Sequence, residues 1–472
     1  MPDPYQSFDI RKQAILEEVQ PSPAKSDLEL LLTHITLYLK RAFHAQTFTD
    51  LNLPDHPLFS FENQPISEEL ASELAYRINI IAEYHLHSPK RISELLTAGL
   101  QLYRPMHFNR KQIQYIQHKG IQPELRTMAL AKLLETSSRT INRDRQILFT
   151  RYGLRVAGIL NPPKFGLAHF GIYFSGPSLK TSLRFKQWLN KQLFFGDAFP
   201  FLTGAMFDVD QISGVFTLFV PDQVQWLKQL HQTIQWIKDV FLDDVEIHQI
   251  RGFFANISLD FYDYGSQQWK ISPDLHTEAV LRFIEEHGSQ FTPLQGFIYH
   301  GEPMAFHPTD WLLTITTCEG LLSKFEQRDL LHHNAFPLSE KTIWTHLRKL
   351  RQKEAYFPYL TFSRMAFEDV LCLLISCEKP TLNILYQLIT QYPMVQLFPT
   401  DDGAIILIGL PTVGPSLIKQ LTRTLLTIPR IFKTKILRFK RNLPLLPSLQ
   451  RHILWRANQR LWKVPPTMCL EE

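Results

Sequence analysis

Apolar and polar positions follow the same order twice along this chain, in two segments about 200 residues apart. In the first segment, Ile141 and Leu148 lie seven residues apart, a spacing that places both on one face of a helix. In the second segment, Ile343, Leu347 and Leu350 form a similar stripe with spacings of four and three. Because internal repetition indicates a duplicated structural unit, this pattern predicts two equivalent halves.

A serine stands directly before each of these helices. Ser137 and Ser339 are each followed two positions later by a basic residue and then by a Thr-Ile pair. Such a serine can accept a backbone N–H bond as the N-cap of a helix. With two further helical segments before each serine, the pattern predicts two helix-turn-helix units whose third helix contacts DNA. The predicted DNA-contacting residues are Ser138, Arg139, Thr140, Asn142, Arg143, Gln146, Ser339, Lys341, Thr342, Thr345, His346, Arg348 and Lys349.

A charged amphipathic helix is also typical of an ordinary solvated face, and this alternative stays open for each copy. The two copies differ at one aligned position, where Arg145 of the first corresponds to the apolar Leu347 of the second. Whether both units contact DNA is therefore a separate question.

A strand-helix-strand-strand-helix-strand pattern follows each predicted helix-turn-helix. In the first copy the strands are expected at 167–174, 201–209, 214–220 and 245–253, with helices at 178–193 and 224–241. In the second copy the strands are expected at 370–377, 395–398, 404–410 and 432–439, with helices at 381–390 and 416–427. This order predicts a four-stranded antiparallel sheet with two helices on one face, the ferredoxin-like arrangement.

The predicted fold class is α+β, with two winged or helix-turn-helix units, each followed by a ferredoxin-like βαββαβ domain, and a helical N-terminal domain. The expected segments are a helical N-terminal domain (1–107), the first helix-turn-helix (108–152), the first ferredoxin-like domain (153–265), a linker with a helix (266–305), the second helix-turn-helix (306–355), the second ferredoxin-like domain (356–445) and a basic tail (446–472).

The chain resembles the leucine-responsive, or feast/famine, transcription regulators. The resemblance rests on the run Leu338 to Ile343 with Leu347 and Leu350, on the strand from Tyr356 to Leu360, and on a hinge-like segment from Phe165 to Leu167. It implies a sequence-specific transcriptional regulator that binds double-stranded DNA, with a small-molecule effector as a further partner. Departures are the duplication itself and a glycine-rich effector loop that is only faintly present, as Thr203-Gly204 and Asp401-Asp402-Gly403.

The duplication suggests how the halves associate. Members of the resembled family pair through their sheets, so a tandem chain is expected to form that pair internally, with a homodimer as a further state. The paired faces are expected to include Phe216, Leu218, Ile406 and Ile408 or their neighbours, and the two recognition helices are expected to form an approximate two-fold pair.

The positive charge is concentrated near the C-terminus. The net charge is +5, and between Gly403 and Leu470 there are about twelve Lys or Arg and no Asp or Glu. The dense run from Arg430 to Arg441 alternates with apolar residues, which fits either an edge strand protected by lysines or a surface that attracts phosphate. Four cysteines and the lack of a long apolar run predict a soluble, cytoplasmic protein without a membrane partner.

Catalytic motifs are missing from the sequence. There is no phosphate-binding glycine loop, no Gly-x-Ser-x-Gly turn and no Cys-x-x-Cys pair, so no catalytic residue, metal or cofactor is predicted and the chain is expected not to be an enzyme. One alternative is an enzyme on the same scaffold that resembles sirohaem decarboxylase, with His169, His248 and Arg251 to position propionates and transfer protons. Another is a scaffold that binds only protein.

Overall fold

The computed structural model describes residues 108–440 with gaps, and two short strands beyond them. The gaps are at 196–201, 209, 211, 260, 264, 267, 272–296, 320–323, 334–336, 363–368, 391, 411–414 and 429. The predicted N-terminal domain (1–107) and most of the predicted linker and tail lie outside the described residues. Within the described part, the chain has a mixed α+β fold with antiparallel sheets, and none of its helices is long and apolar enough to cross a membrane.

The first helical unit consists of three helices, α5 (Arg110–Ile121), α6 (Thr127–Leu133) and α7 (Ser138–Tyr152). Ser137 is the N-cap of α7, and its side chain accepts a hydrogen bond from the Thr140 backbone N–H at 3.1 Å. The helix ends at Tyr152, and its C-cap Gly153 has a φ of 61°, the left-handed conformation that glycine adopts without steric cost. The Ser137 cap that the sequence pattern predicts is therefore present, because such caps are local signals.

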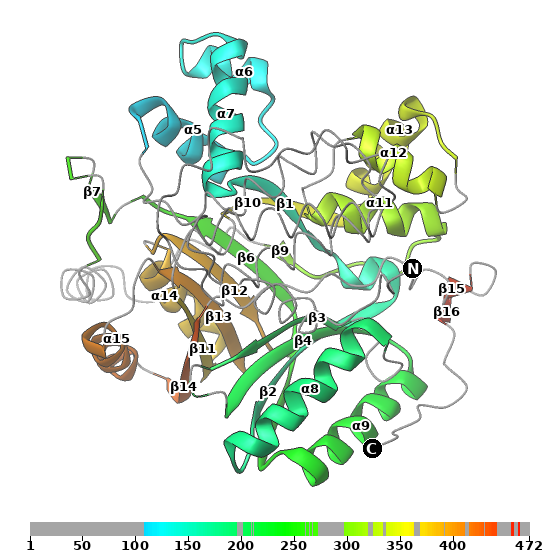
Figure 1. The fold of residues 1–472 in the computed structure, drawn as a ribbon, viewed down its shortest axis with the longest axis vertical. Coiled ribbons are helices and arrows are strands. Elements are labelled where there is room, and N and C mark those ends of the chain that lie inside the picture. The colour runs from blue at the N-terminus through cyan, green and yellow to red at the C-terminus, as the bar shows by residue number, and fades with distance from the viewer. Residues whose placement is uncertain are drawn as a thin grey trace, which may run out of the picture.

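The second helical unit repeats this order with α11 (Pro308–Glu319), α12 (Lys324–His333) and α13 (Glu340–Gln352). Ser339 caps α13 by accepting a bond from the Thr342 backbone N–H at 3.2 Å. The predicted stripe of Ile343, Leu347 and Leu350 is buried. The two units lie at the same end of the molecule (Figure 1).

Two strands join the helical units to the rest of the molecule. β1 (Arg155–Leu160) follows α7, and β10 (Tyr356–Thr361) follows α13. They pair with each other in antiparallel fashion, with Arg155 opposite Thr361 and Leu160 opposite Tyr356. This ribbon ties the two halves together below the helical units (Figure 1).

The first half continues into a four-stranded antiparallel sheet with the strand order β3-β4-β2-β5. Its elements are β2 (Leu167–Ser175), α8 (Leu179–Phe195), β3 (Leu202–Phe207), β4 (Ser213–Pro221), α9 (Val224–Phe241) and β5 (Asp244–Ile250). On the side covered by the helices, Phe185 of α8 packs edge-on against Phe174 of β2 with ring centroids 5.0 Å apart.

The second half has a six-stranded sheet with the order β14-β11-β13-β12-β6-β9. Its elements are β6 (Gly252–Ile257), β9 (Phe297–Ile298), β11 (Asp369–Cys377), α14 (Lys379–Ile389), β12 (Met394–Pro399), β13 (Gly403–Leu410), α15 (Pro415–Thr427) and β14 (Ile431–Lys440). The four strands from β11 to β14 have the same order as in the first half, and β6 and β9 extend their sheet.

One predicted strand is divided in two. The sequence pattern suggests a single strand over 245–253, but the chain leaves the first sheet after Ile250 and joins the second sheet as β6. At the crossing, the Arg251 backbone N–H donates to the Pro399 carbonyl at 2.7 Å. β5 alternates polar and apolar residues and is mostly half-buried, whereas β6 begins with three buried residues, but no turn residue other than Gly252 separates them, so periodicity alone does not reveal the change of sheet.

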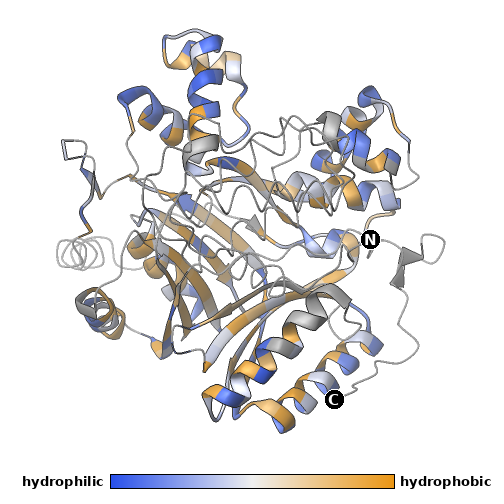
Figure 2. Cartoon of the chain, viewed as in Figure 1, coloured by the Kyte–Doolittle hydropathy of each residue, from blue (hydrophilic) through white to orange (hydrophobic). Residues whose placement is uncertain are grey.

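The two sheets pack face to face. Their shared core contains side chains from both halves, among them Val215, Ile250, Phe253, Ile405 and Leu407. Of the residues named in the prediction, Ile406 and Ile408 belong instead to the core under α14 and α15, while their neighbours Ile405 and Leu407, which the prediction allowed, lie in the shared core. Figure 2 shows apolar residues along both sheets, and a strand that is buried on both faces gives no sequence signal for which face meets which partner.

The remaining elements are short. A 3₁₀ turn, η3 (Pro162–Phe165), precedes β2, and two small hairpins pair β7 (Tyr262–Asp263) with β8 (Gln268–Trp269) and β15 (Trp455–Arg456) with β16 (Leu461–Trp462).

Candidate functional site

The exposed face of α7 carries most of the side chains predicted to contact DNA in the first half. Arg139, Asn142, Arg143 and Gln146 are exposed on it. Neither Arg139 nor Arg143 is ion-paired within the described part of the chain. Ser138 and Thr140 are half-buried at the start of the helix, and the Thr140 hydroxyl lies 3.0 Å from the Ser137 hydroxyl in the cap. The helix therefore presents two unpaired guanidinium groups and two amides to solvent.

The whole first helical unit is strongly cationic. Residues 110–152 contain nine Lys or Arg and three Asp or Glu, an excess of six positive charges. Of the three carboxylates, Asp144 is buried, and Glu124 is ion-paired with Arg351 of the second unit. Burial and the nearby Arg145 lower the pKa of Lys119 to about 8. The surface of this unit is thus positive, with only Glu135 as an exposed acid among its described residues.

The exposed face of α13 is more mixed. Lys341, Thr345, Arg348 and Lys349 are exposed, as predicted for a contact surface, while Ser339 and Thr342 form the cap. His346 lies differently from the expectation, because its Nδ1 is 2.8 Å from Oδ1 of Asp310 on α11 and the side chain is partly buried. The His346 side chain therefore holds two helices of its own unit together.

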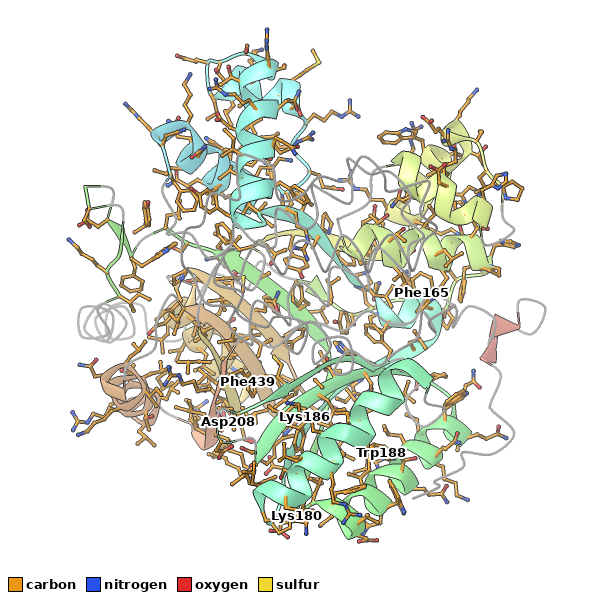
Figure 3. All side chains as sticks on the ribbon, in the orientation of Figure 1. Phe165, Lys180, Lys186, Trp188, Asp208 and Phe439 are labelled. Atoms are coloured by element: carbon orange, nitrogen blue, oxygen red, sulfur yellow. The ribbon has the colours of Figure 1, made fainter. Side chains whose placement is uncertain are left out.

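Side chains of both helical units point away from the body of the molecule (Figure 3). The opposite end, where Figure 3 labels Lys180 and Trp188 on α8, consists of the helices that cover the first sheet. A ligand that contacts α7 therefore approaches from the end that carries the two helical units.

The three residues considered for the enzyme alternative lie between the two halves. His169 on β2 is buried, and its Nδ1 is 3.1 Å from the hydroxyl of Tyr299, which follows β9. Its ring also contacts Phe219 and Phe398, with centroids 4.6 and 6.1 Å away. Burial lowers the pKa of His169 to about 3 and raises the pKa of Tyr299, so this pair is uncharged at neutral pH.

His248 and Arg251 are held by the turn between β12 and β13. His248 Nδ1 lies 3.3 Å from Asp402, and Arg251 donates two hydrogen bonds to the Asp401 carboxylate at 2.7 and 2.8 Å. These side chains therefore join the halves through acids of the β12–β13 turn, whereas His169 is bonded to Tyr299.

The basic strand β14 also makes contacts within the molecule. Lys433 donates to Glu246 at 2.5 Å, and Lys435 donates to Asp244 at 2.9 Å, both across the contact between the halves. The strand is an edge strand, which supports the first of the two interpretations of this basic run. Sequence reasoning missed the acidic partners, because they lie almost 200 residues away and Asp244 and Glu246 show no pattern that points to β14.

Two polar residues that the sequence did not single out lie near the ribbon of β1 and β10. Tyr299 is the partner of His169, and Asn161, fully buried after β1, donates from its side chain to the carbonyls of His300 and Glu354. Among the described residues, no group of three or more His, Cys, Asp or Glu side chains is arranged to hold a metal ion.

Comparisons with known proteins give limited similarity. No protein-family model matches the chain, and no curated protein matches it. Two solved structures of the siroheme decarboxylase NirDL, one in complex with an iron-uroporphyrin III analogue, are each 14% identical and give a TM-score of 0.40, covering 70% of this chain and 90% of the other. The structure of PH0061 is 12% identical with a TM-score of 0.24, covering 31% of this chain and 93% of the other.

These neighbours correct one expectation. The chain was expected not to be an enzyme, but the solved structures that match most of its length are those of an enzyme. At 14% identity and a TM-score of 0.40, this likeness assigns neither substrate nor reaction to this chain.

Proposed function

We propose that the chain binds double-stranded DNA through the first helical unit, with α7 lying in the major groove. The observation that carries this proposal is that Arg139 and Arg143 are exposed and make no ion pair among the described residues, on a unit with an excess of six positive charges. In a helix-turn-helix, residues near the start of the third helix meet base edges, and a cationic surround supplies phosphate contacts.

We interpret α5–α7 and α11–α13 as helix-turn-helix units and the two repeated sheets as ferredoxin-like domains that form a pseudo-dimer within one chain. Two observations favour this interpretation: the identical strand order of the repeated strands and the apolar core that both sheets share. Transcriptional regulation and a small-molecule effector remain predictions.

The test compares two double variants of the full chain. Arg139→Glu with Arg143→Glu should weaken binding to selected genomic DNA at least tenfold, since each good base or phosphate contact contributes on the order of 1–3 kcal/mol. The control is Lys180→Glu with Lys228→Glu, which makes the same change in charge on exposed positions of α8 and α9. Affinity would be measured by fluorescence anisotropy at several salt concentrations, with folding checked by circular dichroism. An equal loss in both variants, or none in either, would contradict a specific role for α7.

A second candidate function is an enzyme that acts at the contact between the halves. The observation that favours it is the buried, uncharged pair His169 and Tyr299. The His169 imidazole and the Tyr299 hydroxyl provide a hydrogen-bonded donor and acceptor for a bound group, and ionisation of His169, whose pKa is about 3, would require an acidic partner in that group.

The substrate of the solved neighbour supplies the first compound to test. Purified protein would be mixed with sirohaem, and binding would be followed by the absorption of the tetrapyrrole and reaction by release of carbon dioxide. His169→Ala should abolish the reaction while Tyr299→Phe should slow it. If the wild-type chain gives no spectral change and releases no carbon dioxide, this candidate function is removed.

A further inference from the structure

We propose that the two helical units bind DNA unequally, so that the chain reads one asymmetric site with α7 and not a palindrome with α7 and α13 together. This inference rests on the proposed DNA-binding function. It departs from the symmetric pair of recognition helices that the sequence repeat suggests.

Equivalent positions on the two helices carry different side chains. Counting from the serine caps, Ser138 of α7 corresponds to Glu340 of α13, and Arg143 corresponds to Thr345. A carboxylate at the first position of α13 lies where DNA phosphates or acceptor atoms of bases would approach, and it repels both. The position that carries a guanidinium on α7 carries a neutral hydroxyl on α13, which bonds to the Lys341 carbonyl of its own helix at 3.0 Å.

The charge around each helix also differs between the two units. Residues 308–352 contain six Lys or Arg and five Asp or Glu, so the second unit has an excess of only one positive charge, against six in the first unit. Glu340 is 3.3 Å from Arg328, so that cation is already matched by an acid. Because the affinity of a protein for DNA depends strongly on the number of phosphates that it neutralises, the first unit should supply most of the binding.

The centre of the exposed face differs as well. Trp344 of α13, with 56% of its surface exposed, stands where α7 has Asn142. An asparagine can bond to adenine with two hydrogen bonds in the major groove, whereas an indole offers a single donor on a bulky ring. His346, the residue two positions further, is turned to Asp310.

The experiment compares matched variants of the full chain on DNA selected by the wild type. Arg139→Glu with Arg143→Glu should lower affinity at least tenfold, whereas Lys341→Glu with Arg348→Glu, an equal change in charge, should lower it less than threefold. The selected site should be a single non-palindromic element, and a footprint should protect one face of about one helical turn.

A gain-of-function variant tests the same idea in the other direction. Glu340→Ser with Trp344→Asn and Thr345→Arg gives α13 the polar residues of α7, and it should raise affinity for a DNA duplex that carries two inverted copies of the selected element. No such gain, together with equal losses in the two double variants and a palindromic selected site, would overturn the asymmetry while leaving DNA binding in place. A wild-type chain that selects no DNA would instead overturn the proposed function itself.

Discussion

Gly171 of β2 lies directly against Ile405 of β13, across the contact between the two sheets. A Cβ atom at position 171 would clash with Cδ1 of Ile405, so the lack of a side chain permits the sheets to approach closely. The two residues belong to different halves of the duplicated chain, and their contact lies within the shared apolar core. This relationship indicates that the halves are fitted to each other.

The first prediction concerns this contact. Gly171→Val should lower the free energy of unfolding by about 1–3 kcal/mol, because extra atoms in a packed core displace their neighbours. Ile405→Ala in the same chain should recover part of the loss by making room, although it leaves a cavity of its own. Urea denaturation of the two single variants and the double variant would measure the coupling, and strictly additive losses would contradict a direct contact.

The second prediction concerns Asn161. Its side-chain amide donates to the Glu354 carbonyl at 2.9 Å and to the His300 carbonyl at 3.2 Å, which ties β1 to the turn before β10. Asn161→Ala should lower the free energy of unfolding by about 1–3 kcal/mol, because two carbonyls lose a buried donor.

At neutral pH, Asn161→Asp should lower the free energy of unfolding more than Asn161→Ala does, since it places a carboxylate against the same two carbonyls. Lowering the pH should reduce this difference, because a protonated carboxyl can donate to one of the carbonyls. Thermal melts at pH 7 and pH 4.5 would check the order, and an Asp variant as stable as wild type at pH 7 would refute the proposed bonding.

The third prediction concerns the ion pairs between β5 and β14. Lys435 lies 2.8 Å from Glu246 and 2.9 Å from Asp244, and its ammonium group is 3.5 Å from the centre of the Tyr173 ring. Lys435→Glu should destabilise the chain by about 1–3 kcal/mol, because it places three carboxylates together and removes the contact with the ring.

Pairing Lys435→Glu with Glu246→Lys should recover part of that loss. Although partial burial opposes ionisation, the bonds from Lys433 and Lys435 lower the pKa of Glu246 below 4.5. The stabilisation by this carboxylate is therefore complete above pH 4.5 and is lost as the pH falls through the lower value in the folded state. Urea denaturation in low and high salt would check the pair, and a reversed pair with no recovery would argue against direct attraction.

The fourth prediction concerns acid stability at His169. The folded-state pKa of about 3 lies below the ordinary value of 6.5, so between these values the unfolded chain binds a proton that the folded chain does not. Stability should therefore fall as the pH falls below 6.5, by up to about 1.4 kcal/mol per pH unit from this one group. His169→Gln should flatten the dependence, whereas the exposed His332 replaced by Gln should not. Parallel pH profiles for both variants would contradict the assignment.

Local sequence signals determined much of the architecture. The serine caps at Ser137 and Ser339, the apolar stripe of α13 and the exposure of Arg139 and Arg143 follow from residues within one or two helical turns of each other. The repeated strand-helix order was also visible, because each element carries its own periodicity.

The tertiary structure decided how these elements meet. The side of β13 that faces the other sheet carries Ile405 and Leu407, and both faces of this strand are equally apolar, so alternation could not choose between them. The crossing at Arg251, the turn of His346 towards Asp310 and the neutralisation of Lys433 by Glu246 depend on partners distant in sequence. A periodic pattern reports only that a side chain will be buried or exposed, and the identity of its partner arises when separate elements pack together.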